Sequence, residues 1–124
     1  MPETLRGLEI VLAGGSGGLG SATAELLAGE GARLVVSYRL NAERAEKLAP
    51  IATLVQADLT ALHDRQRLLD AAPNLYGLVV FAGDPSRLSD PSELEAVMRR
   101  SYEQNCLGPM MLAREAAELM ECFQ

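Results

Sequence analysis

Five glycines lie within the eight residues Ala13-Gly14-Gly15-Ser16-Gly17-Gly18-Leu19-Gly20. The apolar run Leu8–Ala13 before them predicts a buried strand, and apolar residues at helical spacing predict a helix over Gly18–Gly29. Glycine at a strand-to-helix turn lets a phosphate group reach the backbone N–H groups of the helix N-terminus, because no Cβ intervenes. The stretch therefore predicts a nucleotide-binding turn, and a tight structural turn is the alternative.

The glycines fit three spacings, so the stretch alone does not choose among the known nucleotide-binding patterns. The spacings are Gly15-x-Gly17-x-x-Gly20, Gly14-x-x-Gly17-x-x-Gly20 and Gly14-x-x-x-Gly18-x-Gly20.

The rest of the chain alternates short apolar runs with stretches of helical period. The predicted strands are Leu8–Ala13, Arg33–Tyr38, Ala52–Gln56 and Leu75–Ala82. The predicted helices are Gly18–Gly29, Asn41–Leu48, Leu62–Ala71 and a last helical region from Pro91, interrupted at Gly108-Pro109. This β-α alternation predicts an α/β fold with a doubly wound parallel sheet.

Three helix starts carry residues of the capping type. Asn41 is the predicted N-cap of the second helix, and either Asp58 or Thr60 that of the third. Ser92 and Glu95 are spaced as a capping box for the last helical region.

Composition excludes several classes of protein. The 124 residues are 48% hydrophobic and 23% charged, which predicts one globular domain over residues 1–124. A net charge of −6 disfavours nucleic acid and anionic membrane as partners. Two cysteines and one histidine predict no disulfide scaffold and no metal site. With no signal peptide and no long apolar run, we expect a soluble cytoplasmic protein.

Three later segments follow the predicted elements in order. They are Asp58-Leu59 after the third strand, Phe81-Ala82-Gly83 at the end of the fourth, and Asn105-Cys106-Leu107-Gly108 in the last helix. Together with Ala13-Gly14…Gly18-Leu19-Gly20, they resemble the landmarks of the short-chain dehydrogenase/reductase family.

The resemblance implies the N-terminal, NAD(P)-binding half of a Rossmann-like domain, with four strands in the order 3-2-1-4. It also implies hydride transfer between nicotinamide and a carbonyl or alcohol substrate. Asp58 would meet the adenine, and Asn105 would belong to the catalytic set. The cofactor-binding residues implied are Gly14, Ser16, Gly17, Gly18, Leu19, Gly20, Asp58, Leu59, Ala82 and Gly83.

Two positions depart from the family pattern, because Ala13 replaces a threonine and Phe81 an asparagine. In the family these polar side chains help to tie the first turn to the fourth strand. Replacing both partners by apolar groups can be nearly neutral for the fold, since no buried partner is left unpaired.

The end of the second strand, Ser37-Tyr38-Arg39, predicts the choice of cofactor. An acidic residue there would bind the ribose 2′-hydroxyl of NAD, but the family resemblance places Tyr38 at that position. Arg39 can neutralise a 2′-phosphate and Ser37 can hydrogen-bond it, which favours NADP over NAD. A solvated arginine at a strand end is the alternative.

Pro109 bears on the proposed role of Asn105. A proline at this position has no N–H to donate to the carbonyl of residue 105, which predicts a free acceptor there. The resemblance implies that this carbonyl holds a water of a proton relay. A plain Gly-Pro kink is the alternative.

The Tyr-x-x-x-Lys pair of the family has no counterpart, because Lys47 is the single lysine and Glu43 lies four residues before it. We therefore expect the chain to be inactive alone, and a non-catalytic nucleotide-binding or interaction module is the alternative.

The strand Leu75–Ala82 is predicted to have a bare edge, and Leu107 and Met111 are predicted to be exposed on the last helix. Both features predict a homo-oligomer or association with a missing C-terminal half.

Overall fold

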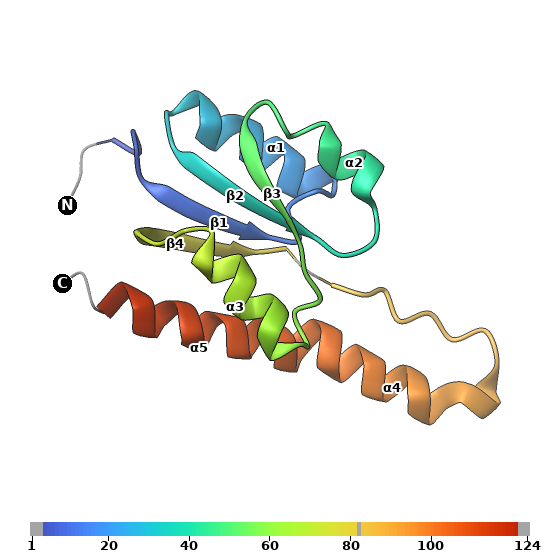
Figure 1. Cartoon of the computed structure of the whole chain (residues 1–124). Helices are drawn as coiled ribbons and strands as arrows, with labels where there is room; N and C mark the ends of the chain where they lie inside the picture. Colours follow the sequence, from blue (N-terminus) through green and yellow to red (C-terminus); the bar gives the residue numbers. More distant parts are fainter. Residues whose placement is uncertain (1–3, 82, 122–124) are drawn as a thin grey trace.

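A four-stranded parallel sheet lies between two layers of helices in the computed structural model, which describes residues 4–81 and 83–121 (Figure 1). The strands are β1 (Glu9–Ala13), β2 (Arg33–Tyr38), β3 (Ala52–Gln56) and β4 (Leu75–Val80), in the order β3-β2-β1-β4. The helices are α1 (Gly18–Gly29), α2 (Ala42–Glu46), α3 (Leu62–Asp70), α4 (Leu94–Tyr102) and α5 (Gly108–Glu121). The predicted fold class and strand order are confirmed.

Alternate residues of the central strands enter two separate cores, because successive side chains of a strand point to opposite faces. On the face covered by α3 and α5, the core includes Val11, Val35, Leu68 and Leu112. On the face covered by α1 and α2, it includes Ile10, Leu12, Ala24, Leu34, Val36 and Leu48. Helices on both faces explain why the strands are nearly continuous apolar runs (Figure 1).

The apolar pair that replaces the family's polar tie is part of this packing. Ala13 is buried, and Phe81 packs against the core beneath α1. The N–H of Phe81 donates to the carbonyl of Ala13 at 2.8 Å, which continues the β1–β4 pairing past the end of β4. The fold therefore accommodates both departures.

The predicted cap of α3 is wrong. Neither Asp58 nor Thr60 is the N-cap, which is Ala61 and has no side-chain hydrogen bond. The Asp58 carboxylate accepts from the N–H of Thr60 at 2.9 Å and from its hydroxyl at 2.7 Å, which makes a local turn. Asn41 does cap α2, where its side chain accepts from the N–H of Arg44.

The capping box predicted from Ser92 and Glu95 is also wrong. Asp90 accepts from the N–H of Ser92 at 3.0 Å and begins a short 3-10 turn, Pro91–Glu93, which leads into α4. Asp90 rather than Ser92 caps the turn, because a carboxylate two residues before an N–H can accept from it and close a local turn.

The interruption predicted at Gly108-Pro109 is a π-helical turn over Glu103–Leu107 between α4 and α5. The N–H of Gly108 donates to the carbonyl of Glu103, five residues earlier. A Cβ at Gly108 would lie 2.9 Å from the carbonyl oxygen of Leu59. Glycine thus lets the start of α5 contact the loop that follows β3.

Large apolar side chains are exposed along α4, the π-helical turn and the start of α5. They are Leu94, Met98, Tyr102, Leu107 and Met110, whereas Met111, which was predicted to be exposed, is half-buried. Within the described ranges, no helix is both long and apolar enough to cross a membrane.

Candidate functional site

A cleft of about 420 Å³ opens where the strands of the sheet end at their carboxyl edge. Of the residues that the sequence analysis assigned to cofactor binding, it is lined by Gly14, Ser16, Gly17, Ser37, Tyr38, Arg39, Leu59 and Gly83. The remaining described ones, Gly18, Leu19, Gly20 and Asp58, are not among its lining residues. Ala82 lies outside the described residues.

The lack of side chains in the glycine turn has three consequences. Gly14 has a φ of +74°, a left-handed conformation that favours glycine. A Cβ at Gly20 would lie 2.5 Å from the Cα of Gly15, so the start of α1 can approach the turn only without a side chain. Gly17 and Gly18 face open space, with nothing within 4 Å of an added Cβ.

The backbone N–H of Gly14 donates to the hydroxyl of Ser37 at 2.9 Å. Ser37 is 2% exposed and lies in β2, so this bond ties the glycine turn to the neighbouring strand. Ser37 was predicted to hydrogen-bond a phosphate, and its bond to the glycine turn was not predicted. A buried serine one residue before the end of a strand beside a glycine turn is the signal that could have found it.

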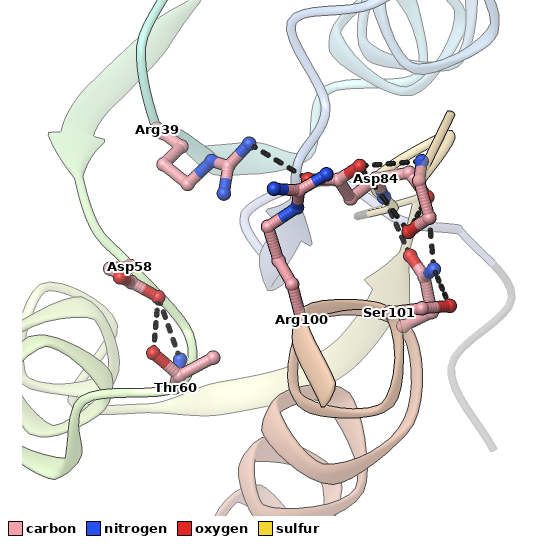
Figure 2. Close-up of polar contacts among 8 residues, drawn as sticks. Arg39, Asp58, Thr60, Asp84, Arg100 and Ser101 are labelled. Carbon is pink, nitrogen blue, oxygen red and sulfur yellow. Dashed lines mark hydrogen bonds and ion pairs between the residues drawn. The ribbon is translucent and has the colours of Figure 1, made fainter. Parts of the chain in front are cut away.

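The loop after β4 is fastened to the π-helical turn by Asn105. The side-chain amide of Asn105 accepts from the N–H of Asp84 at 2.6 Å and donates to the carbonyl of Asp84 at 2.9 Å (Figure 2). The same amide nitrogen donates to the hydroxyl of Ser101 at 3.2 Å. Both ends of the amide therefore fix the backbone of one residue at the edge of the cleft.

Two arginines meet the Asp84 carboxylate (Figure 2). Arg39, after β2, lies 3.7 Å from its Oδ2, and Arg100, on α4, lies 3.4 Å from the same oxygen. The other oxygen, Oδ1, accepts from the N–H of Ser86 at 2.6 Å. This N–H, together with Arg100 and Arg39, holds the pKa of Asp84 below its usual range.

Asp58 lies at the far side of the same region (Figure 2). Partial burial raises the pKa of its carboxyl, but hydrogen bonds from Thr60 and Gln104 and the charge of Arg39 lower it by more. The net result is a pKa below the ordinary value, so Asp58 is a carboxylate at neutral pH.

Asn105, the predicted catalytic residue, is exposed and does not line the cleft. It lies close to Gly83, where an added Cβ would be 3.3 Å from its side-chain oxygen. Asn105 lies in the π-helical turn Glu103–Leu107, and because Pro109 has no N–H to donate, a free carbonyl at Asn105 stays a prediction.

Several polar residues of the site were missed from the sequence. Asn41, Arg44 and Gln104 line the cleft, and Asp84 joins Arg39 to Arg100. Arg44 could have been found, because a helix predicted to start at Asn41 places its first turn beside the end of β2.

Comparison with known proteins agrees with this geometry. A model of the short chain dehydrogenase family matches residues 9–123. An uncharacterized oxidoreductase of Listeria monocytogenes is 32% identical over 111 residues, which are 82% of this chain and 43% of that protein. A variant of a Serratia marcescens short-chain dehydrogenase/reductase has a TM-score of 0.84 at 29% identity, covering 95% of this chain and 53% of that one. A Burkholderia cenocepacia protein with bound NADP has a TM-score of 0.81 at 27% identity, covering 95% and 50%.

The chain spans about half the length of the curated relatives that it matches. The match nevertheless extends over nearly all of the chain, from the first residue of β1 to beyond the end of α5. The glycine turn, the strand order and the Asn105 segment all fall within it. The chain thus belongs to the short-chain dehydrogenase family.

Proposed function

We propose that this chain binds NADP(H) and is the dinucleotide-binding part of an oxidoreductase that acts on a small carbonyl or alcohol substrate. Residues 1–124 would form one Rossmann-like half-domain. We also propose that the protein acts in the cytoplasm, as its cysteine usage suggests, and that it is a homo-oligomer or associates with a C-terminal half.

The open side of the glycine turn carries this proposal. Gly17 and Gly18 lie at the N-terminus of the twelve-residue helix α1, and nothing occupies the space that their side chains would fill. The open N-terminus of α1 suits a pyrophosphate, because backbone N–H groups and the helix dipole both favour an anion there. The residues proposed to hold it are Gly14, Ser16, Gly17, Gly18, Leu19 and Gly20.

The positive side chains of the cleft favour NADP over NAD. Arg39 and Arg44 both line it, and neither Ser37 nor Tyr38 offers a carboxylate to a ribose 2′-hydroxyl. Arg39 is 37% exposed, so its guanidinium can reach a ligand in the cleft. An arginine beside a phosphate forms strong charge-assisted hydrogen bonds. Asp58 and Leu59 are proposed to border the adenine. Ala82 and Gly83 are proposed to border the end of the cleft beside β4.

Bound NADP would supply or accept the hydride of the reaction. The residues of this chain would bind it, orient it and keep the loop after β4 in place. Asn105 is proposed to serve the reaction through its main chain, while its amide fixes Asp84 at the edge of the cleft.

Titration of the chain with NADPH and NADH, followed by ligand fluorescence, tests the proposal. NADPH is expected to bind about ten- to a hundredfold more tightly, the worth of one charge-assisted contact. Equal affinities would refute the cofactor choice. Failure to bind either would refute nucleotide binding and favour the alternative of an interaction module.

A further inference from the structure

Arg39 is already engaged in an ion pair before any ligand is considered. It follows β2, whereas its partner Asp84 follows β4, and β1 lies between these two strands in the sheet. The Arg39 side chain therefore reaches across the carboxyl end of β1, beside the glycine turn (Figure 2). The cation proposed to recognise the ribose phosphate is held toward the opposite side of the cleft.

Asp84 is fixed so that it can hold this cation. Its backbone N–H and carbonyl are both bound by the Asn105 amide. Its Oδ1 accepts from the N–H of Ser86, which has a φ of +52°, a left-handed conformation that is uncommon for serine. These contacts leave Oδ2 facing the two arginines. The side chain of Asp84 is 13% exposed, so water screens the Arg39–Asp84 pair less than it would a fully exposed pair.

We propose that Asp84 is a specificity-determining residue, an internal counter-ion that competes with the ligand's 2′-phosphate for Arg39. The inference rests on the proposed binding of NADP. A 2′-phosphate recruits Arg39 only by breaking its ion pair with Asp84, so Asp84 lowers the preference for phosphorylated over unphosphorylated ribose. The carboxylate thereby sets how far the chain discriminates between the two cofactors.

Arg100 opposes this competition. It shares Oδ2 with Arg39 and lies slightly closer, at 3.4 Å against 3.7 Å. When Arg39 moves to a phosphate, Arg100 remains as the partner of the carboxylate. Removing Arg100 would leave Asp84 with Arg39 alone and strengthen the hold on it. Changes at Asp84 and Arg100 are therefore expected to act in opposite directions.

Two small probes isolate the phosphate effect, adenosine 2′,5′-bisphosphate and adenosine 5′-phosphate, with affinities measured by calorimetry. In Asp84→Asn, the ratio of affinities for the two probes is expected to rise about two- to fivefold, the scale of a part-exposed ion pair. The asparagine keeps an oxygen for the N–H of Ser86 and leaves the Asn105 bonds intact. In Arg100→Gln, the same ratio is expected to fall by a similar factor.

Matched variants control for charge alone. Glu43→Gln removes one negative charge from the exposed surface of α2, and Arg99→Gln removes one positive charge beside Arg100 on α4. Neither is expected to change the ratio of affinities. In an Arg39→Gln background, Asp84→Asn is expected to lose its effect, because the competition requires both partners.

An unchanged ratio in Asp84→Asn, or a rise that persists without Arg39, would overturn the inference. A wild-type chain with no preference for the 2′-phosphate refutes the proposed cofactor choice instead. In that case the Asp84→Asn variant still tests the competition. A preference for the 2′-phosphate in this variant supports the competition, and no preference overturns it.

Discussion

The hydroxyl of Ser37 and the N–H of Gly14 lie 2.9 Å apart and join β2 to the glycine turn. Gly14 has a φ of +74°, the left-handed conformation that favours glycine. The family's polar tie from the position of Ala13 to that of Phe81 is missing in this chain. Ser37 thus provides a different polar connection for the same turn.

Ser37→Ala removes this connection and leaves the Gly14 N–H without its partner. We expect the free energy of unfolding to fall by about 0.5–1.5 kcal/mol, as for one lost hydrogen bond, because Gly14 is only partly buried and lines the cleft. Dinucleotide affinity is expected to fall as well, because the turn is less well fixed. Urea unfolding measures the first effect. Thr23→Val, which removes an exposed hydroxyl on α1, is the control and should change stability by less than about 0.5 kcal/mol.

Substitutions at two glycines of the turn are expected to be harmful for different reasons, one through stability and the other through dinucleotide binding. Gly20→Ala places a Cβ against the backbone of Gly15 and should destabilise the fold by about 1–3 kcal/mol. Gly18→Val meets open space within the protein, so the fold should survive while dinucleotide binding is abolished. Unfolding and fluorescence titration of both variants separate the two effects. If Gly18→Val kept full affinity, the turn would be structural only.

Much of the fold could be predicted because apolar periodicity and glycine position specify it locally. The bounds of α1 and β2 agree with prediction, since Gly29 ends the helix and a β-branched run makes the strand. The caps were mispredicted at Asp58 and Ser92. Several side chains within two or three residues of a helix start can accept the same N–H, and backbone geometry decides among them.

The polar part of the site was less predictable. Arg39, Asp84 and Arg100 are far apart in sequence and meet only because the strand order brings β2 and β4 to either side of β1. No local pattern indicates that contact. The π-helical turn likewise brings Gly108 against Leu59, which is distant in sequence, whereas the turn at Ser86 is local, since its N–H donates to Asp84 two residues earlier.

Replacement of Tyr38 by Asp and Arg39 by Leu is expected to reverse the cofactor preference. The carboxylate can accept from the ribose hydroxyls of NAD, and the phosphate of NADP loses its cation. The loss at the phosphate corresponds to about 1.5–3 kcal/mol, or roughly ten- to a hundredfold in affinity. Binding of both cofactors is the measurement, and an unchanged ratio would contradict the assignment of Arg39.

Thr60→Val is expected to destabilise the protein more at neutral than at acid pH. The Thr60 hydroxyl donates to Asp58 and helps to lower its pKa below the ordinary value of about 3.9. A depressed folded-state pKa contributes stability above the unfolded-state value, and that contribution is lost as pH falls through the folded-state value. Urea unfolding near neutral pH and below pH about 3 tests this. Thr60→Ser keeps the hydroxyl and should show a smaller difference, whereas an equal loss at both pH values would contradict the prediction.

The exposed apolar side chains on α4 and α5 are expected to make the 124-residue chain self-associate. Leu94, Met98 and Tyr102 line a shallow groove on α4, and Met110 is exposed farther along. Covering such a surface removes apolar area from water, which favours association. Light scattering at tens of micromolar should therefore report a mass above that of the monomer.

Met98→Glu should shift this chain toward monomer, because the carboxylate would have to be buried in the contact. Leu26→Glu, at an equally exposed apolar position on α1, is the matched control and should leave association unchanged. If both variants associate as the unaltered chain does, the contact lies elsewhere, and the edge of β4 with its exposed Tyr76 becomes the surface to alter. A monomeric unaltered chain would contradict the prediction, because the exposed apolar face of α4 would then be stable in water without a partner.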